Sequence, residues 1–131
     1  MAQEEKSYQI GKQIIAEHDL QFTVEYSGEI FTLRYPNIAE RASIEAEISR
    51  NLGNQPRSNF SAEHVALIEA TVYAQNLVIP EKSPKWFTNA WTCPDEELLS
   101  QLYIGYFQFR GKLREKLRTG GFKPVSEAGS T

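Results

Sequence analysis

The residues best suited to chemistry in this 131-residue chain are two histidines, one cysteine and one run of acids. Neither His18 nor His64 has a second ligand at a metal-binding spacing such as His-x3-His or Cys-x2-Cys. Cys93 lies close to three carboxylates, which disfavour the thiolate that a nucleophile requires. Those carboxylates, Asp95–Glu97, are consecutive, so on a helix they point in different directions and cannot converge on one ion or substrate. We therefore predict no catalytic residue, no metal site, no cofactor and no enzymatic activity.

Charge and hydropathy bear on the class of partner. A basic segment, Lys112–Arg118, follows the aromatic sequence YIGYFQFR at 103–110, a mixture that could stack on and neutralise a nucleic acid. The formal net charge is −3, however, and the same aromatic residues fit the buried stripe of a helix, so we expect no nucleic-acid partner. No apolar run approaches the roughly 20 residues that a membrane span needs, so we expect no membrane partner either.

The compartment is predicted from the single cysteine and from the first residues. One cysteine excludes an internal disulfide and is typical of a reducing compartment. Residues 1–6 are acidic and polar, and no apolar core of a signal peptide follows them. These features predict a cytoplasmic protein.

Alternating apolar residues predict a β-hairpin over residues 21–35, the clearest strand signal in the chain. Gly28 lies between the two alternating runs and can supply the positive φ of a tight turn, and Pro36 ends the second run. A two-stranded hairpin is only marginally stable alone, so we expect its apolar face to pack on helices. That face carries Phe22, Val24, Tyr26, Phe31, Leu33 and Tyr35.

Two amphipathic helices are predicted after the hairpin. Asn37 and Glu40 have the spacing of a capping box, and apolar residues then recur at helical spacing over Ile38–Leu52. Ser61 is expected to cap the second helix, and Pro80 to halt it.

The third helix is predicted to be the longest, over Pro94–Arg118. Thr92 and Pro94 are expected to begin it, with Asp95–Glu97 in its first turn, where acids favour the positive end of the helix dipole. Gly120 is expected to stop it. Its apolar stripe comprises Leu98, Leu99, Leu102, Tyr103, Tyr106, Phe107, Phe109, Leu113 and Leu117.

The predicted fold class is α+β and mostly α, an N-terminal β-hairpin followed by three amphipathic helices. Residues 1–20 are predicted to form a flexible arm that orders on docking, residues 21–119 a single domain, and residues 120–131 a disordered tail.

Aromatic residues are the strongest candidates for function. Both tryptophans lie in SPKWFTNAW at 83–91, a connector between two predicted helices, where polar residues would be usual. Tryptophan and tyrosine contribute much of the binding energy at protein interfaces. Alternatively, the tryptophans pin the connector to the aromatic face of the hairpin. The candidate protein-binding residues are Trp86, Phe87, Trp91, Tyr103, Tyr106 and Phe107.

The order of these features resembles the tail assembly chaperones of long-tailed, siphovirus-like bacteriophages. The resemblance covers about residues 22–118, and no catalytic residue can be transferred because such proteins are not enzymes. The segments that carry it are YSGEIFTLRYPNIAERASIEAEISRNLG (26–53), ATVYAQNLV (70–78), PKWF (84–87) and PDEELLSQLYIGYFQFRGKLR (94–114).

The resemblance implies a mostly helical protein of the host bacterial cytoplasm. Such a chaperone binds the tape measure protein, keeps it soluble, helps to recruit tail tube protein and is absent from the mature virion. It also implies a possible longer form made by ribosomal frameshifting. The alternative is a structural component or adaptor of the particle, such as a head–tail connector or minor tail protein. Surplus apolar faces would favour self-association in either case.

Overall fold

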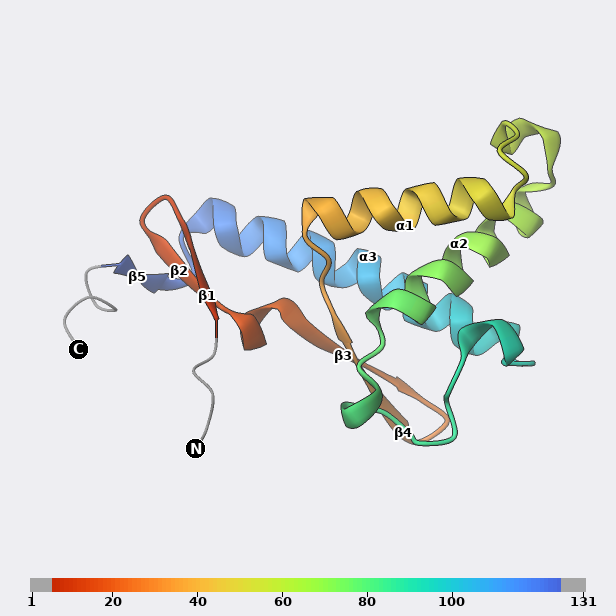
Figure 1. Cartoon of the computed structure of the whole chain (residues 1–131). Helices are drawn as coiled ribbons and strands as arrows, with labels where there is room; N and C mark the ends of the chain where they lie inside the picture. Colours follow the sequence, from red (N-terminus) through yellow and green to blue (C-terminus); the bar gives the residue numbers. More distant parts are fainter. Residues whose placement is uncertain (1–5, 126–131) are drawn as a thin grey trace.

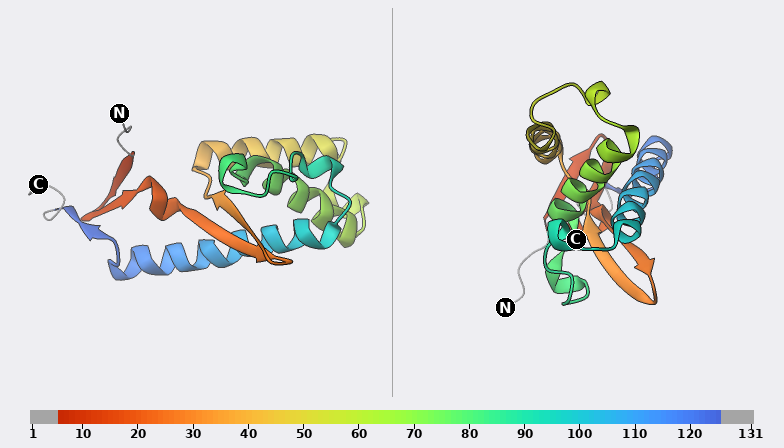
Figure 2. Two further views of the ribbon diagram at one scale, coloured as in Figure 1. Left: turned by 90° about the horizontal axis from the view of Figure 1, so that it is seen from below. Right: turned by 90° about the vertical axis from the view of Figure 1, so that its right-hand side faces the viewer.

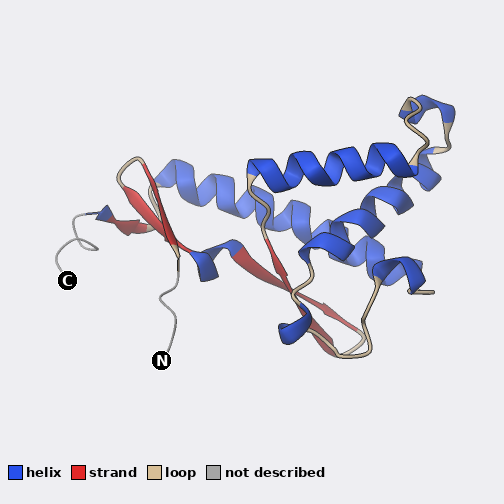
Figure 3. Cartoon of the chain, viewed as in Figure 1, coloured by secondary structure: helices blue, strands red, loops and turns tan. Residues whose placement is uncertain are grey.

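The computed structural model describes residues 6–125 and has α+β architecture (Figure 1). Its helices are α1 (Ile38–Asn51), α2 (Ala62–Leu77) and α3 (Glu96–Thr119). One antiparallel sheet has the order β1 (Ser7–Ile10), β2 (Gln13–Ala16) and β5 (Lys123–Pro124), and the other pairs β3 (Gln21–Tyr26) with β4 (Glu29–Arg34). Short 3-10 helices occupy connections (Figure 3): η1 (Glu17–Leu20), η2 (Arg57–Asn59), η3 (Pro80–Lys82) and η4 (Ala90–Thr92). The prediction of a mainly helical α+β fold is confirmed.

The β3–β4 hairpin forms where the alternating pattern predicts it. Phe22 is opposite Leu33 in the register, and the two-residue turn has positive φ at both Ser27 (51°) and Gly28 (78°). That combination gives a type I′ turn, whose twist matches the twist of the flanking strands. Leu33 and its neighbour in the pattern, Phe31, are completely buried, so the hairpin packs by its aromatic and aliphatic face.

The first two helices begin at the predicted caps. The Asn37 side chain accepts a hydrogen bond from the Glu40 amide at 2.8 Å, and the Glu40 carboxylate accepts one from the Asn37 amide at 3.1 Å. Both donors would otherwise lack a partner at the helix start. Ser61 caps α2 by accepting from the His64 amide at 3.1 Å. The helix ends at Leu77, three residues before the proline that was expected to halt it.

The start of α3 differs from the prediction of Thr92 and Pro94. The N-cap is Asp95, whose carboxylate accepts hydrogen bonds from the amides of Glu97 (3.1 Å) and Leu98 (3.2 Å). The hydroxyl of Tyr26, at the end of β3, donates to the same carboxylate at 2.7 Å. A residue 69 positions away along the chain therefore takes part in this helix start, which local spacing cannot reveal.

The N-terminal arm is where the structure departs furthest from the prediction. Residues 7–16, predicted as part of a flexible arm, form the β1–β2 hairpin, and β2 also pairs with β5 from the predicted tail. Ile15, Leu113 and Phe122 make a small buried cluster beneath this sheet. One partner of β2 is the adjacent β1, but the other, β5, comes from the far end of the chain, so no local pattern indicates that pairing. The parts of the predicted arm and tail at 1–5 and 126–131 lie outside the described residues.

The main core lies between the β3–β4 hairpin and the three helices. At one point α3 approaches β3 so closely that a Cβ on Gly105 would be 2.4 Å from Val24 Cγ2. Figures 1 and 2 show that α3 runs from this core to the β1–β2 hairpin and so joins the two sheets. Long-range packing of one helix thus holds both ends of the molecule together.

Candidate protein-binding surface

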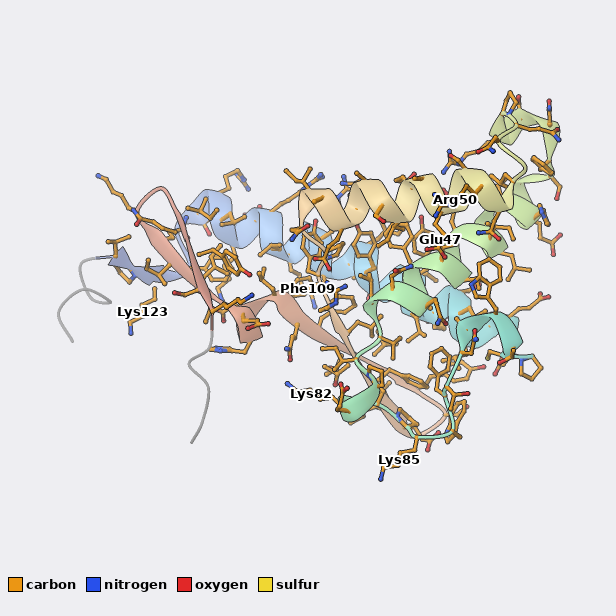
Figure 4. All side chains as sticks on the ribbon, viewed as in Figure 1. Glu47, Arg50, Lys82, Lys85, Phe109 and Lys123 are labelled. Atoms are coloured by element: carbon orange, nitrogen blue, oxygen red, sulfur yellow. The ribbon has the colours of Figure 1, made fainter. Side chains whose placement is uncertain are left out.

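The aromatic connector, residues 83–91, is fixed to the body by hydrogen bonds at both of its ends. The Thr32 amide donates to Ser83 Oγ at 3.1 Å, and Ser83 Oγ donates back to the Thr32 carbonyl at 3.3 Å. At the other end, the amide of buried Ala90 donates to Gln75 Oε1 at 2.7 Å. The connector is therefore attached to β4 and to α2. Figure 4 shows Lys82 and Lys85 along this side of the molecule and Lys123 at the opposite end.

Trp86 and Phe87 are adjacent but have opposite environments. Phe87 is 9% exposed and packs edge-on against Phe31 with ring centroids 5.4 Å apart. Trp86 is 56% exposed, and its Nε1 donates to Glu29 Oε2 at 2.6 Å while one side of its ring contacts Phe31. Phe87 therefore belongs to the core, and Trp86 presents an apolar surface held in one orientation.

Trp91 also faces outward. It is 42% exposed and lies in η4, where the Asn89 side chain accepts a hydrogen bond from the Trp91 amide at 2.8 Å. The residue before it, Ala90, is 1% exposed and turns inward toward α2. Neither tryptophan is buried in the core. Trp86 nevertheless contacts Phe31 and Glu29 of the hairpin, as the pinning interpretation expects, and it leaves 56% of its surface exposed as the interface interpretation expects.

The three aromatic candidates on α3 differ in burial. Tyr106 is 1% exposed and contacts the ring of Tyr73 at 4.9 Å, and Tyr103 is half-buried beside it. Burial raises the pKa of both Tyr103 and Tyr106 above the ordinary tyrosine value. Phe107 is 47% exposed and leans on the Tyr103 ring at 4.8 Å. Of these three residues, only Phe107 is exposed.

Five of the six predicted residues form two groups through their ring contacts. Trp86 and Phe87 contact each other and β4, while Tyr103, Tyr106 and Phe107 contact one another on α3. No ring contact joins the two groups within the part of the chain that the structure describes. The connector residues and the α3 residues are therefore distinct aromatic clusters.

A groove that the sequence did not indicate lies beside the β1–β2 hairpin. It has a volume of about 1310 Å³ and is bounded by this hairpin, the start of α1 and the end of α2. Its apolar residues include Tyr8 (47% exposed), Ile10 (49%) and Ile38 (88%). The alternation of Tyr8 and Ile10 with polar neighbours is a weak strand signal that could have indicated it.

Two hydrogen bonds between tyrosine hydroxyls and carboxylates shift the pKa values of the tyrosines. The bond to Asp95 is the main cause that raises the pKa of Tyr26 to about 12, and the same bond lowers the pKa of Asp95. Tyr73 donates to Glu45 at 2.8 Å, and burial followed by this bond raises the pKa of Tyr73. Both pairs join separate elements, so they are structural links.

Within residues 6–125, no group of three or more His, Cys, Asp and Glu side chains is placed to hold a metal ion. The helices in the same range include none with the length and apolar character needed to cross a membrane. Comparison of the chain with protein-family models, curated proteins and solved structures gave no match.

Proposed function

We propose that this chain is an assembly chaperone for a bacteriophage tail that binds the tape measure protein and keeps it soluble. The observation that carries the proposal is Trp86, which is 56% exposed although Glu29 and Phe31 hold its ring in place. A fixed apolar ring loses little conformational entropy on binding, and tryptophan is enriched among residues that dominate interfaces. A long helical client offers the amphipathic surface that such an anchor fits.

The remaining parts of the proposal rest on the resemblance of residues 22–118 to tail assembly chaperones. In this proposal the protein acts in the host bacterial cytoplasm, helps to recruit tail tube subunits and leaves before the virion is complete. Mass spectrometry of purified virions separates it from the alternative, because a head–tail connector or minor tail protein would be present in fixed copy number.

The test is co-expression with the tape measure protein of the same genome. The wild-type chain should raise the soluble yield of that protein and co-purify with it. Trp86→Ala should weaken the interaction by about 2 kcal/mol or more, whereas Lys85→Ala, in the same connector, should not. An unchanged soluble yield together with no co-purification would refute the proposed function.

A further inference from the structure

One face of α3 carries the spacing of a helix–helix contact but has no helix against it. Both views in Figure 2 place α3 at the periphery of the molecule. Five residues follow one another at intervals of three and four on the face away from the buried Leu102, Tyr106 and Leu113. These residues, called the α3 seam, are Ile104, Phe107, Gly111, Arg114 and Arg118.

The first half of the α3 seam is apolar and accessible. Ile104 is 44% exposed and Phe107 is 47% exposed. The Phe107 ring is braced by Tyr103 and Tyr106, at centroid distances of 4.8 and 5.3 Å. Phe107 therefore presents a supported ring to solvent, as a preorganised anchor does.

No contact among the described residues requires a glycine at position 111, the centre of the seam. A Cβ added there would have no atom within 4 Å, in contrast to Gly105, where Val24 would be 2.4 Å away. Glycine is among the least favourable residues in the interior of an exposed helix. Its usual advantage at such a place is that another backbone can approach closely. Gly111 thus leaves room on this face for a backbone that is not among the described residues.

The second half of the seam is basic, and so is this whole end of the molecule. Residues 6–20 and 110–125 together contain eight basic and three acidic residues, whereas 21–109 contain six basic and eleven acidic residues. Arg114 and Arg118 are both exposed, and Arg118 contacts Glu115. An occupant of this end must be acidic to complement it.

We propose that the α3 seam binds an amphipathic helix of a partner protein. The partner helix is apolar where it meets Ile104 and Phe107, and acidic where it meets Arg114 and Arg118. An antiparallel orientation places those acids at the N-terminal end of the partner helix, where they also complement its own dipole. The identity of the partner as the tape measure protein rests on the proposed function.

A second copy of the chain fits the seam less well. An antiparallel crossing of two α3 helices at Gly111 would place Arg114 and Arg118 of each copy against Phe107 and Ile104 of the other, where the arginines meet no acid. A parallel crossing would place each Arg114 beside its equivalent. Like charges at such close quarters oppose association, so charge complementarity selects an acidic partner.

The test uses the full chain and a labelled synthetic helix of about 20 residues, a length that favours helix formation. The peptide carries leucines at seam spacing in its C-terminal half and glutamates in its N-terminal half. Fluorescence anisotropy should show binding by the wild type, and Gly111→Leu and Arg114→Glu should each weaken it by about 10-fold or more. Matched substitutions on exposed positions of α1, Ala46→Leu and Arg50→Glu, should not weaken it.

Two further readouts separate binding from folding. Gly111→Ala should raise the melting temperature by about 3 °C, because alanine favours the helix, and should weaken binding as well. A peptide with lysines in place of glutamates should bind Arg114→Glu better than it binds the wild type. The proposal that the seam binds a helix would be overturned if binding is lost only in variants that also lose stability, or if the wild type does not bind the peptide.

The same variants, tested for co-purification with the tape measure protein, distinguish this inference from the proposed function. If the tape measure protein co-purifies equally with the wild type and the seam variants, the seam is not its binding site and the proposed function stands. If the peptide binds the seam and the tape measure protein does not co-purify, the proposed function is wrong and the seam stands.

Discussion

At the scale of single residues, the connector shows how two adjacent aromatic side chains take different roles. Phe87 contacts Phe31 from within the core, whereas Trp86 contacts the same ring from outside and is tied to Glu29. Exposure, and not residue type, therefore separates the anchor of the fold from the candidate anchor of the client.

Replacing these two residues should have opposite effects on stability and binding. Phe87→Ala removes a core ring and should lower the free energy of unfolding by about 3 kcal/mol or more. Trp86→Ala should lower it by less than about 1 kcal/mol while reducing binding to the client. Urea denaturation and pull-downs on both variants measure this. Equal losses of stability in the two variants would contradict the environments described.

The pair of Tyr26 and Asp95 predicts a pH dependence with a definite sign. The pKa of Tyr26 is raised from 10.0 to about 12, so its contribution to stability is complete below pH 10 and is lost as the pH rises toward 12. The pKa of Asp95 is lowered from 3.8, so its contribution is present above that pH and is lost as the pH falls through the lowered value.

Tyr26→Phe removes the hydrogen bond at every pH and isolates the effect. The difference in urea midpoint between wild type and variant should be constant from about pH 5 to 9 and should shrink toward both extremes. Circular dichroism at a series of pH values measures it. A difference that persists at pH values above the raised pKa would show that the hydroxyl acts in another way.

At the scale of elements, α3 is the helix on which the rest of the structure depends. Gly105 lets it approach β3, Asp95 joins its start to Tyr26, and Leu113 reaches the cluster beneath the β1–β2 hairpin. The two glycines of this helix therefore differ in their packing. Gly105 is required by the fold, and Gly111 is left free by it.

Alanine at these two positions should change stability in opposite directions. Gly105→Ala forces a methyl group against Val24 and should cost about 1 to 3 kcal/mol, even though alanine favours the helix. Gly111→Ala meets no atom and should stabilise by about 1 kcal/mol. Chemical denaturation compares them directly. The double variant Gly105→Ala/Val24→Ala should recover part of the loss, and no recovery would place the strain elsewhere.

At the scale of the whole molecule, the two ends of the described chain meet in one sheet. β5 pairs with β2, and the Gln13 side chain accepts a hydrogen bond from the Phe122 amide at 3.2 Å while donating to the Leu117 carbonyl at 2.9 Å. Phe122 is 7% exposed, and Lys116 lies over its ring at 4.4 Å. Phe122 thus stabilises the pairing of β5 with β2, next to the groove beside the β1–β2 hairpin.

Phe122→Ala should open this sheet without unfolding the main core. Hydrogen exchange should show a loss of protection in β2 and at Val125, whose amide donates to the Lys12 carbonyl, while α2 remains protected. Phe107→Ala, which removes an exposed ring from α3, is the control and should leave β2 protected. Equal protection of β2 in both variants would mean that β5 does not hold the sheet.

Features of the fold that depend on residues close together in the sequence were predictable, and features that depend on distant residues were not. The turn at Gly28 and the caps at Asn37 and Ser61 depend on neighbouring residues, and they were predicted correctly. The start of α3 was misplaced because Asp95, and not Thr92, is the N-cap; the same carboxylate also accepts a hydrogen bond from Tyr26 of β3. The candidate surface was only partly predictable, because aromatic residues can be recognised in a sequence while their exposure cannot.

Local sequence accounts for the β3–β4 hairpin, the order of the three helices and the aromatic character of the connector, because spacing and capping act within a few residues. The placement of the β1–β2 hairpin depends on tertiary contacts, since β2 also pairs with β5 about 110 residues later. The exposure of the connector residues also depends on contacts with β4, more than 50 residues earlier in the chain. Phe87 contacts Phe31 from within the core, whereas Trp86 contacts the same ring from outside and donates to Glu29. Burial is a property of such distant contacts, so it is the folded chain that selects which aromatic rings can bind a partner.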